Sequence, residues 1–231
     1  MKRSNCPTWK RAHFLVNDES SEVESRGPRS RFAVATSLIY RSASIYELAM
    51  RLLYGRHYTS RYHAISDLIK TGSSVLDLCC GPALLYHYLK SKDVQYLGLD
   101  INAKFIDQLN RSGGNGQVWD LRSEQPLPRA DYIIMQASLY HFLPDASPVV
   151  NRMLQAARRQ VIIAEPIRNL ATSDSRLLAL IGRMFSNAGT GEQHFRFSES
   201  SLAEFFSKYS SRVVQSFPIA GGREKIYVLQ A

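Results

Sequence analysis

The chain has 231 residues, 45% of them hydrophobic, which suits one domain with a continuous core and excludes wholesale disorder. No apolar run approaches the roughly 18 residues that a membrane span needs, and the apolar stretch at residues 14–16 is too short for a signal peptide, so we expect a cytoplasmic protein without a membrane span. The formal net charge of +9 comes from Lys and Arg spread along the whole chain, which indicates a modestly basic surface and leaves an anion- or RNA-binding surface as the alternative.

The three cysteines are Cys6 and the adjacent pair Cys79 and Cys80. An odd number without a disulfide framework indicates a reducing compartment. The sequence has no C-x-x-C pair and no other metal-ligand spacing, so we expect no metal site. Burial as small hydrophobic side chains explains the adjacent pair better than redox chemistry does.

The first 71 residues are predicted to precede the main domain. Residues 1–35 lack sustained periodicity and are rich in Ser, Arg and Glu, which predicts a flexible or loosely packed extension. Residues 36–71 are predicted to form a helical cap, with one helix that ends near Gly55 and a second helix after it. The second helix carries one stripe of apolar residues: Tyr58, Tyr62, Ile65 and Ile69. The stripe is either an amphipathic packing face or part of a lid over a ligand.

In the main domain, residues 72–231, short apolar runs alternate with helical patterns. Five runs are predicted strands: 74–79, 95–100, 117–119, 132–137 and 160–164. Three helices are predicted between them: 83–91, 103–111 and 148–158. Apolar strands that alternate with helices indicate a parallel sheet that is covered by helices on both faces.

The C-terminal part of the chain has a different pattern. Helices are predicted at 173–185 and 199–208, and strands at 212–219 and 225–229. The link between these two strands, around Gly221, is so short that they must pair antiparallel. The predicted fold is therefore α/β and Rossmann-like, a seven-stranded and mainly parallel sheet with an antiparallel C-terminal strand.

The loop after the first strand is the most informative segment. It reads Val75-Leu-Asp-Leu-Cys-Cys-Gly-Pro-Ala83, a buried strand that leads into a turn of small residues before a helix. Ligands of open α/β sheets bind at the carboxyl ends of the strands, where small residues let a ligand approach the backbone. The dinucleotide signature G-x-G-x-x-G is absent, because Gly81 is the one glycine of this loop, so an oxidoreductase is not expected.

This segment resembles the first motif of class I S-adenosylmethionine-dependent methyltransferases, an acid followed by a G-x-G-x-G loop. Its Cys-Cys-Gly form is similar to small-molecule enzymes of methyltransferase type 11, such as those of quinone biosynthesis. The resemblance covers about residues 40–231. It implies that Cys79, Cys80 and Gly81 wrap the amino-acid part of S-adenosylmethionine, and that Asp77 helps to hold its ammonium group. Cys79 and Ala83 replace two of the three usual glycines.

Two further predicted strands also end in an acid. Asp100 matches the family's ribose-binding acid, since a carboxylate can accept hydrogen bonds from two hydroxyl groups. Asp120 matches the position that often binds the adenine amino group. The predicted cofactor site also includes their neighbours Ile101 and Leu121. A helix N-cap or a simple turn before Asn102 for Asp100, and an exposed turn for Asp120, stay open as alternatives, and Trp119 is expected in the core.

The fourth strand and the residues after it resemble the segment of the family that lies beside the methyl donor. Gln136 and Ala137 are therefore predicted cofactor residues. His141 follows this strand and is the candidate catalytic base for an acceptor that must lose a proton. The alternative is that His141 caps or packs the next turn. His194 and Glu165 are the other candidate bases.

The predicted function is methyl transfer from S-adenosylmethionine to a small-molecule acceptor by direct displacement, which requires alignment of the reacting atoms and no metal. A nucleic-acid or protein methyltransferase is one alternative. Nucleic acid is the less favoured partner, because the fourth strand lacks an N/D-P-P-Y/W motif and the chain lacks an added recognition domain. A non-catalytic cofactor-binding protein with this fold is the other alternative. The sequence carries no pattern that identifies the acceptor or the oligomeric state.

Overall fold

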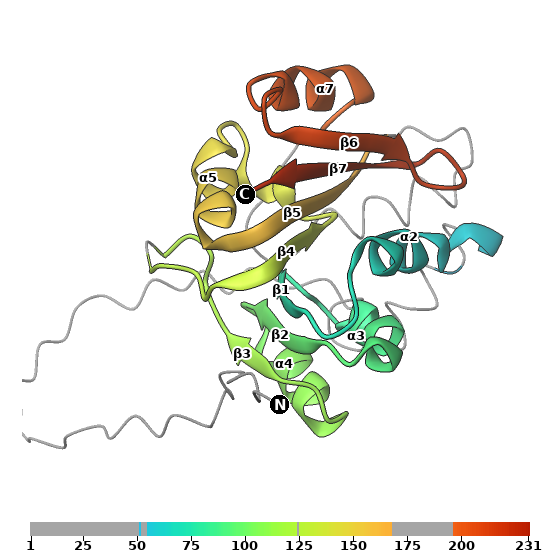
Figure 1. Cartoon of the computed structure of the whole chain (residues 1–231), viewed down its shortest axis with the longest axis vertical. Coiled ribbons are helices and arrows are strands. Elements are labelled where there is room, and N and C mark those ends of the chain that lie inside the picture. The colour runs from blue at the N-terminus through green and yellow to red at the C-terminus, as the bar shows by residue number, and fades with distance from the viewer. Residues whose placement is uncertain (1–50, 52–54, 124, 168–195) are drawn as a thin grey trace, which may run out of the picture. The chain divides into compact units, whose positions relative to one another are not determined.

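The computed structural model describes residues 51, 55–123, 125–167 and 196–231 (Figure 1). The predicted extension 1–35, the first cap helix, the helix at 173–185 and His194 lie outside the described residues. No helix among the described residues is long and apolar enough to cross a membrane.

A seven-stranded sheet forms the centre of the domain, in the order β3-β2-β1-β4-β5-β7-β6. The strands are β1 Ser74–Leu78, β2 Gln95–Asp100, β3 Gly116–Val118, β4 Ala130–Gln136, β5 Ala157–Pro166, β6 Val213–Pro218 and β7 Glu224–Gln230. Strands β1 to β5 pair in parallel, and β7 pairs antiparallel with both β5 and β6. The predicted fold class is confirmed, including the antiparallel strand near the C-terminus.

Helices cover both faces of this sheet, as predicted (Figure 1). The α-helices are α2 Ser60–Leu68, α3 Leu84–Leu89, α4 Ala103–Arg111, α5 Ser147–Ala156 and α7 Glu199–Ser207. Short 3-10 turns are η2 Gly55–His57, η3 Lys90–Lys92 and η4 Leu139–Phe142. Alternate residues of each strand point to opposite faces. Leu76 of β1 therefore joins a core with α5 and α7, whereas Val75 joins a second core with α2 and α3.

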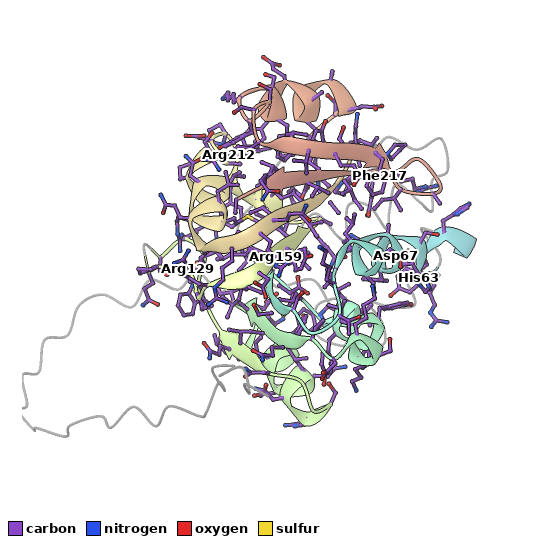
Figure 2. All side chains as sticks on the ribbon, in the orientation of Figure 1. His63, Asp67, Arg129, Arg159, Arg212 and Phe217 are labelled. Carbon is purple, nitrogen blue, oxygen red and sulfur yellow. The ribbon has the colours of Figure 1, made fainter. Side chains whose placement is uncertain are left out.

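Helix α2 belongs to the second core. The predicted stripe is buried, and the ring of Tyr62 stacks on that of Tyr88 in α3, with 5.2 Å between ring centroids. Figure 2 shows His63 and Asp67 on the outer side of α2, and both side chains are exposed. The stripe therefore holds α2 against the sheet by apolar burial, and since Tyr62 also lines the cavity described below, its role in a lid stays a prediction.

Several predicted boundaries differ from the observed ones. Strand β5 begins at Ala157, so Ala157 and Arg158 lie in a strand and not in the predicted helix 148–158. The first residues of β5 are paired on both sides. Ala157 pairs with Ala130 of β4, and the Arg159 carbonyl accepts a hydrogen bond from the Ala231 N–H. Strand β3 ends at Val118, before Trp119. Pairing with neighbouring strands sets where each strand begins and ends. The local sequence pattern carries no information about that pairing.

The strand order also fixes where a ligand can bind. The chain crosses from β1 to β2 in one direction along the sheet and later to β4 in the other direction, so β1 and β4 are adjacent at the centre. In open α/β sheets the loops diverge at such a switch point and leave a crevice at the carboxyl ends of the strands. The loop at 79–83 lies at this point.

Candidate cofactor-binding site

A cavity of about 200 Å³ lies at the carboxyl ends of β1 to β4. Every predicted cofactor residue except Asp77 lines it, and the candidate base His141 does so too. The predicted residues on its wall are Cys79, Cys80, Gly81, Asp100, Ile101, Asp120, Leu121, Gln136 and Ala137. Residues that are far apart in the sequence therefore meet in one cavity, because parallel strands all end at the same edge.

The loop after β1 has three left-handed residues. The φ angles are +53° at Cys79, +54° at Gly81 and +52° at Ala83. A side chain in this conformation strains the backbone, and glycine avoids the strain because it has no Cβ. These are the three positions that glycine occupies in the methyltransferase motif. The chain thus keeps the backbone shape of the motif with glycine at the middle position alone.

Asp100 joins this loop to the next one. Its Oδ2 accepts a hydrogen bond from the Gly81 N–H at 2.8 Å, and its Oδ1 accepts one from the Asn102 N–H at 2.8 Å. The N-cap of α4 is Asn102, whose side chain accepts from the Lys104 N–H. Asp100 is therefore not the cap of the helix, but it does form the turn before Asn102 that was the other part of this alternative. Burial raises the pKa of the Asp100 carboxyl above its usual value, and the hydrogen bonds from Asn102 and Gly81 oppose this.

Asp77 lies beside the cavity without lining it. Its side chain is 1% exposed, and its Oδ2 accepts a hydrogen bond from the Tyr96 hydroxyl at 2.7 Å. Burial raises the pKa of Asp77 to about 7, while the bond from Tyr96 lowers it. The observed role of Asp77 is to join β1 to β2, and its contact with a cofactor ammonium group stays a prediction.

The two cysteines are not reactive thiols. Burial raises the pKa of both Cys79 and Cys80, and the charges of Asp77 and Asp100 raise it further. Because the thiolate is the reactive form, these cysteines act as small wall residues. Their environment agrees with the expectation that the pair carries no redox chemistry.

The segment after β3 forms another wall of the cavity. Trp119 is half-buried and packs against the core that includes α5 and α7, so the prediction of a core residue is confirmed in part, and it also lines the cavity. The strand ends one residue earlier, which frees the indole from the alternation of the strand. The indole Nε1 is buried without a hydrogen-bond partner among the described residues. Asp120 forms an exposed turn with the Arg122 N–H at 2.8 Å, as one alternative proposed, and it also lines the cavity, while its contact with a cofactor adenine stays a prediction.

Glu165 holds the loop after β4. Its Oε1 accepts hydrogen bonds from the N–H groups of Ser138 and Leu139, each at 2.6 Å. Burial raises the pKa of Glu165 to about 8, against the two backbone hydrogen bonds. Glu165 does not line the cavity, which removes it as a candidate base.

Before this loop, Gln136 reaches the cavity and has an Oε1 that is buried without a partner among the described residues.

His141 lies in the 3-10 turn that follows this loop. Its ring packs against that of Tyr140, with 4.0 Å between centroids, and the Arg196 guanidinium carbon lies 3.7 Å from the Tyr140 centroid. Burial lowers the pKa of His141 to about 4, and the charges of Arg196 and Arg122 lower it further. The imidazole is therefore neutral at pH 7. The His141 ring packs within its own turn, which was the alternative to a role as catalytic base, and it also lines the cavity.

Arg61 is a cavity residue that the sequence pattern did not reveal. It comes from α2 and forms an ion pair with Glu224 of β7 at 3.1 Å, with side chains only 4% and 1% exposed. Its guanidinium also lies 5.6 Å from the Tyr62 ring centroid. The sequence held one indication, an arginine within the apolar stripe of α2.

The described residues hold no group of three or more His, Cys, Asp or Glu side chains that could bind a metal ion.

Solved structures share this fold. Magnesium protoporphyrin IX methyltransferase (ChlM) from Synechocystis PCC 6803 with bound SAH has 16% identity and a TM-score of 0.58, over 83% of this chain and 95% of that chain. A chain of the complex between the Haloferax volcanii Trm112 methyltransferase activator and the putative methyltransferase has 13% identity and a TM-score of 0.62, over 85% and 99%. A SAM-dependent methyltransferase from Aquifex aeolicus has 15% identity and a TM-score of 0.54, over 80% and 97%.

At these identities the likeness establishes the class I methyltransferase fold. No curated protein sequence matches the chain significantly. A family model does match, that of methionine biosynthesis protein MetW, over residues 59–187. This match spans β1 to β5 and every residue that lines the cavity, from Arg61 to Phe142. Since it covers more than half of the chain, the protein belongs to the MetW family of the class I methyltransferase fold.

Proposed function

We propose that the chain binds S-adenosylmethionine in the cavity at β1 to β4 and catalyses methyl transfer to a small molecule. The observation that carries the proposal is the meeting of the loop at 79–81 with Asp100, Asp120 and Gln136 on one cavity wall. These residues lie at the ends of four different strands. The methyltransferase resemblance assigns the cofactor to the same residues.

Unpaired polar atoms support a polar ligand in this cavity. The Nε1 of Trp119 and the Oε1 of Gln136 are both buried without a hydrogen-bond partner among the described residues. Buried polar atoms are nearly always paired in folded proteins, because an unpaired one costs about 1–3 kcal/mol. S-adenosylmethionine carries an ammonium group that can donate to Gln136 and ring nitrogens that can accept from Trp119.

Each part of the cofactor has candidate partners. The backbone at 79–81 would surround the amino-acid part, and Asp100 would bind the ribose hydroxyls. Each Asp100 oxygen accepts one backbone N–H and retains a second lone pair for a hydroxyl group. Asp120, Leu121 and Ile101 would enclose the adenine. When bound, S-adenosylmethionine supplies a methyl carbon that its sulfonium already activates.

The chain's own contribution to the reaction is alignment in a space that excludes water. Well-oriented intramolecular reactions reach effective molarities of roughly 10⁵–10⁸ M. Tyr62 and Arg61 place α2 on the cavity wall, which supports the prediction that the helical segment 36–71 covers the cofactor. Aromatic side chains of Phe105, Tyr140 and Phe142 also line the cavity and favour a small acceptor over a polymer.

Isothermal titration calorimetry with S-adenosylmethionine and S-adenosylhomocysteine tests the proposal. We expect both to bind, and we expect Gln136→Leu to weaken binding about tenfold through loss of one hydrogen bond to a charged group. Gln108→Leu on the exposed face of α4 is the matched control and should bind normally. If neither compound binds, the proposal is wrong. If both bind but no acceptor is methylated, the non-catalytic alternative is favoured.

A further inference from the structure

Two arginines lie close to the cavity residue His141, and one of them, Arg122, is itself a lining residue of the cavity. Arg122 lines the cavity together with His141 and Tyr140. Arg196 is held over the Tyr140 ring at 3.7 Å from the centroid, a cation–π contact that fixes its position. Both charges reach His141, since each lowers the pKa of its imidazole after the larger effect of burial.

No carboxylate in the described part of the chain neutralises these two arginines by an ion pair. Asp120 lines the cavity and accepts a hydrogen bond from the Arg122 backbone N–H, and two further acids near the cavity also accept backbone hydrogen bonds. Asp100 accepts from Gly81 and Asn102, and Glu165 accepts from two backbone N–H groups behind the wall. Since burial raises the pKa of Glu165 to about 8, its carboxyl is mostly uncharged at pH 7.

The part of the cavity around His141 lacks a strong base among the described residues. Burial and the two arginines lower the pKa of His141 to about 4, so its imidazole binds a proton weakly. A phenol or an alkylammonium group, with a pKa of about 10, would not lose its proton to such a base at a useful rate. An acceptor group that is already ionised at pH 7 needs no base. A carboxylate, with a pKa of about 4, is such a group.

We propose that the acceptor is a small organic acid, held by Arg122 and Arg196 beside His141, and that a carboxylate oxygen receives the methyl group. This inference rests on the proposed function and names its acceptor class. A guanidinium can hold one carboxylate oxygen while the other attacks. The neutral His141 ring contributes an N–H donor or packing to the same group, and the Tyr140 ring supports both.

The chemistry of the step balances without another reactant. A bond forms between the carboxylate oxygen and the methyl carbon, the bond from that carbon to sulfur breaks, and its electron pair goes to sulfur. The negative charge of the acid and the positive charge of the sulfonium both disappear. The products are a methyl ester and S-adenosylhomocysteine, and no proton is released. Alcohol or amine methylation, in contrast, releases one proton per turnover.

A labelled-methyl assay on the full chain tests the acceptor class. S-adenosylmethionine with a tritiated methyl group is incubated with a panel of aliphatic and aromatic monocarboxylic and dicarboxylic acids. Each acid is paired with its primary amide and its alcohol. We expect label only with acids, and we expect mild alkali to release the label as volatile methanol, because it hydrolyses methyl esters. Transfer to an alcohol or amide, a label that is stable to alkali, or no transfer to any acid would each overturn the inference.

Arginine variants link the acceptor to its predicted site. Arg122→Ala and Arg196→Ala should each raise the KM for the acid about 10- to 100-fold, the loss of one charge-assisted hydrogen bond, while Arg→Lys at either position should lose less. The Kd for S-adenosylmethionine should stay unchanged. Arg129→Ala is the matched control, because Arg129 is exposed and precedes β4 at the opposite edge of the sheet (Figure 2). An unchanged KM in both alanine variants would contradict the site.

Calorimetry on the same preparation separates the two proposals. If S-adenosylmethionine binds and the methyl group goes to alcohols or amides, the acceptor class is wrong and the proposed function stands. If S-adenosylmethionine does not bind, the proposed function is itself wrong and the inference falls with it.

Discussion

The Gly81 N–H donates a hydrogen bond to the Oδ2 of Asp100 at 2.8 Å, and this contact joins the first two loops of the cavity. The other oxygen of Asp100 accepts from Asn102 at the start of α4. One carboxylate therefore shapes both the loop that would surround the amino-acid part of the cofactor and the site of its ribose.

Replacement of Asp100 by Ala should weaken binding of S-adenosylmethionine by about 100-fold or more, because two ribose contacts and the loop geometry are lost together. Asp100→Asn should lose less, since its amide oxygen can still accept one backbone N–H. Calorimetry measures both effects. Asp107→Ala on the exposed face of α4 is the control, and an equal loss in that variant would show that the effect is not local.

The left-handed residues in the loop at 79–83 predict that loss of a glycine there lowers stability and that gain of a glycine does not. Gly81→Ala should destabilise the protein by about 1–2 kcal/mol from backbone strain alone, because an added Cβ would meet no atom within 4 Å. Cys79→Gly should leave stability unchanged or raise it, since it relieves the same strain at φ +53°. Urea unfolding gives both values. A stable Gly81→Ala variant together with an unstable Cys79→Gly variant would contradict the strain argument.

The buried pair Arg61–Glu224 should be costly to break. Arg61→Met or Glu224→Gln alone should lower the free energy of unfolding by about 3–5 kcal/mol, because each leaves one buried charge without its partner. The double variant should be less destabilised than the sum of the two. The exposed pair Lys225–Glu199, at 3.3 Å, is the comparison, and its removal should cost less than about 1 kcal/mol. Equal costs for the two pairs would refute the assignment of this effect to burial.

Glu165 predicts a measurable pH dependence of stability. Its pKa is about 8 in the folded chain and near 4.5 in the unfolded chain, so between these values the folded state binds more protons. This group therefore makes stability fall as the pH rises from about 4.5 to 8. Glu165→Gln removes the titration and keeps an oxygen for the Ser138 and Leu139 N–H groups.

The Tm difference between Glu165→Gln and the unmodified chain should accordingly become more favourable to the variant from pH 5 to pH 8. Scanning calorimetry across this range measures it. The control is Glu204→Gln on the exposed face of α7, which should follow the unmodified chain at every pH. A difference that does not change with pH would argue that Glu165 is ionised in the fold.

Local patterns in the sequence were enough to determine the elements and their class. Apolar runs that alternate with helical stripes identified all seven strands, and a turn at Gly221 too short for a crossover required the antiparallel pair. The acids at the ends of the predicted strands also indicated the edge of the sheet where a ligand would bind. In a parallel sheet all strands end on one side, so Asp100 and Asp120 had to lie at the same edge, and the pairing of β2 with β3 brings them onto one cavity wall.

The tertiary structure decided which polar groups face the cavity and which hold its walls. Asp77 and Asp100 both come from the ends of parallel strands, yet Asp77 is buried against Tyr96 and Asp100 lines the cavity. Trp119 packs against the core and also lines the cavity, because β3 ends at Val118, and Arg61 reached the cavity because α2 packs beside β7. Each of these outcomes depends on a partner from a distant part of the chain. Sequence periodicity shows only which face of its own helix or strand a residue occupies. It carries no information about the distant residue that packs against that face.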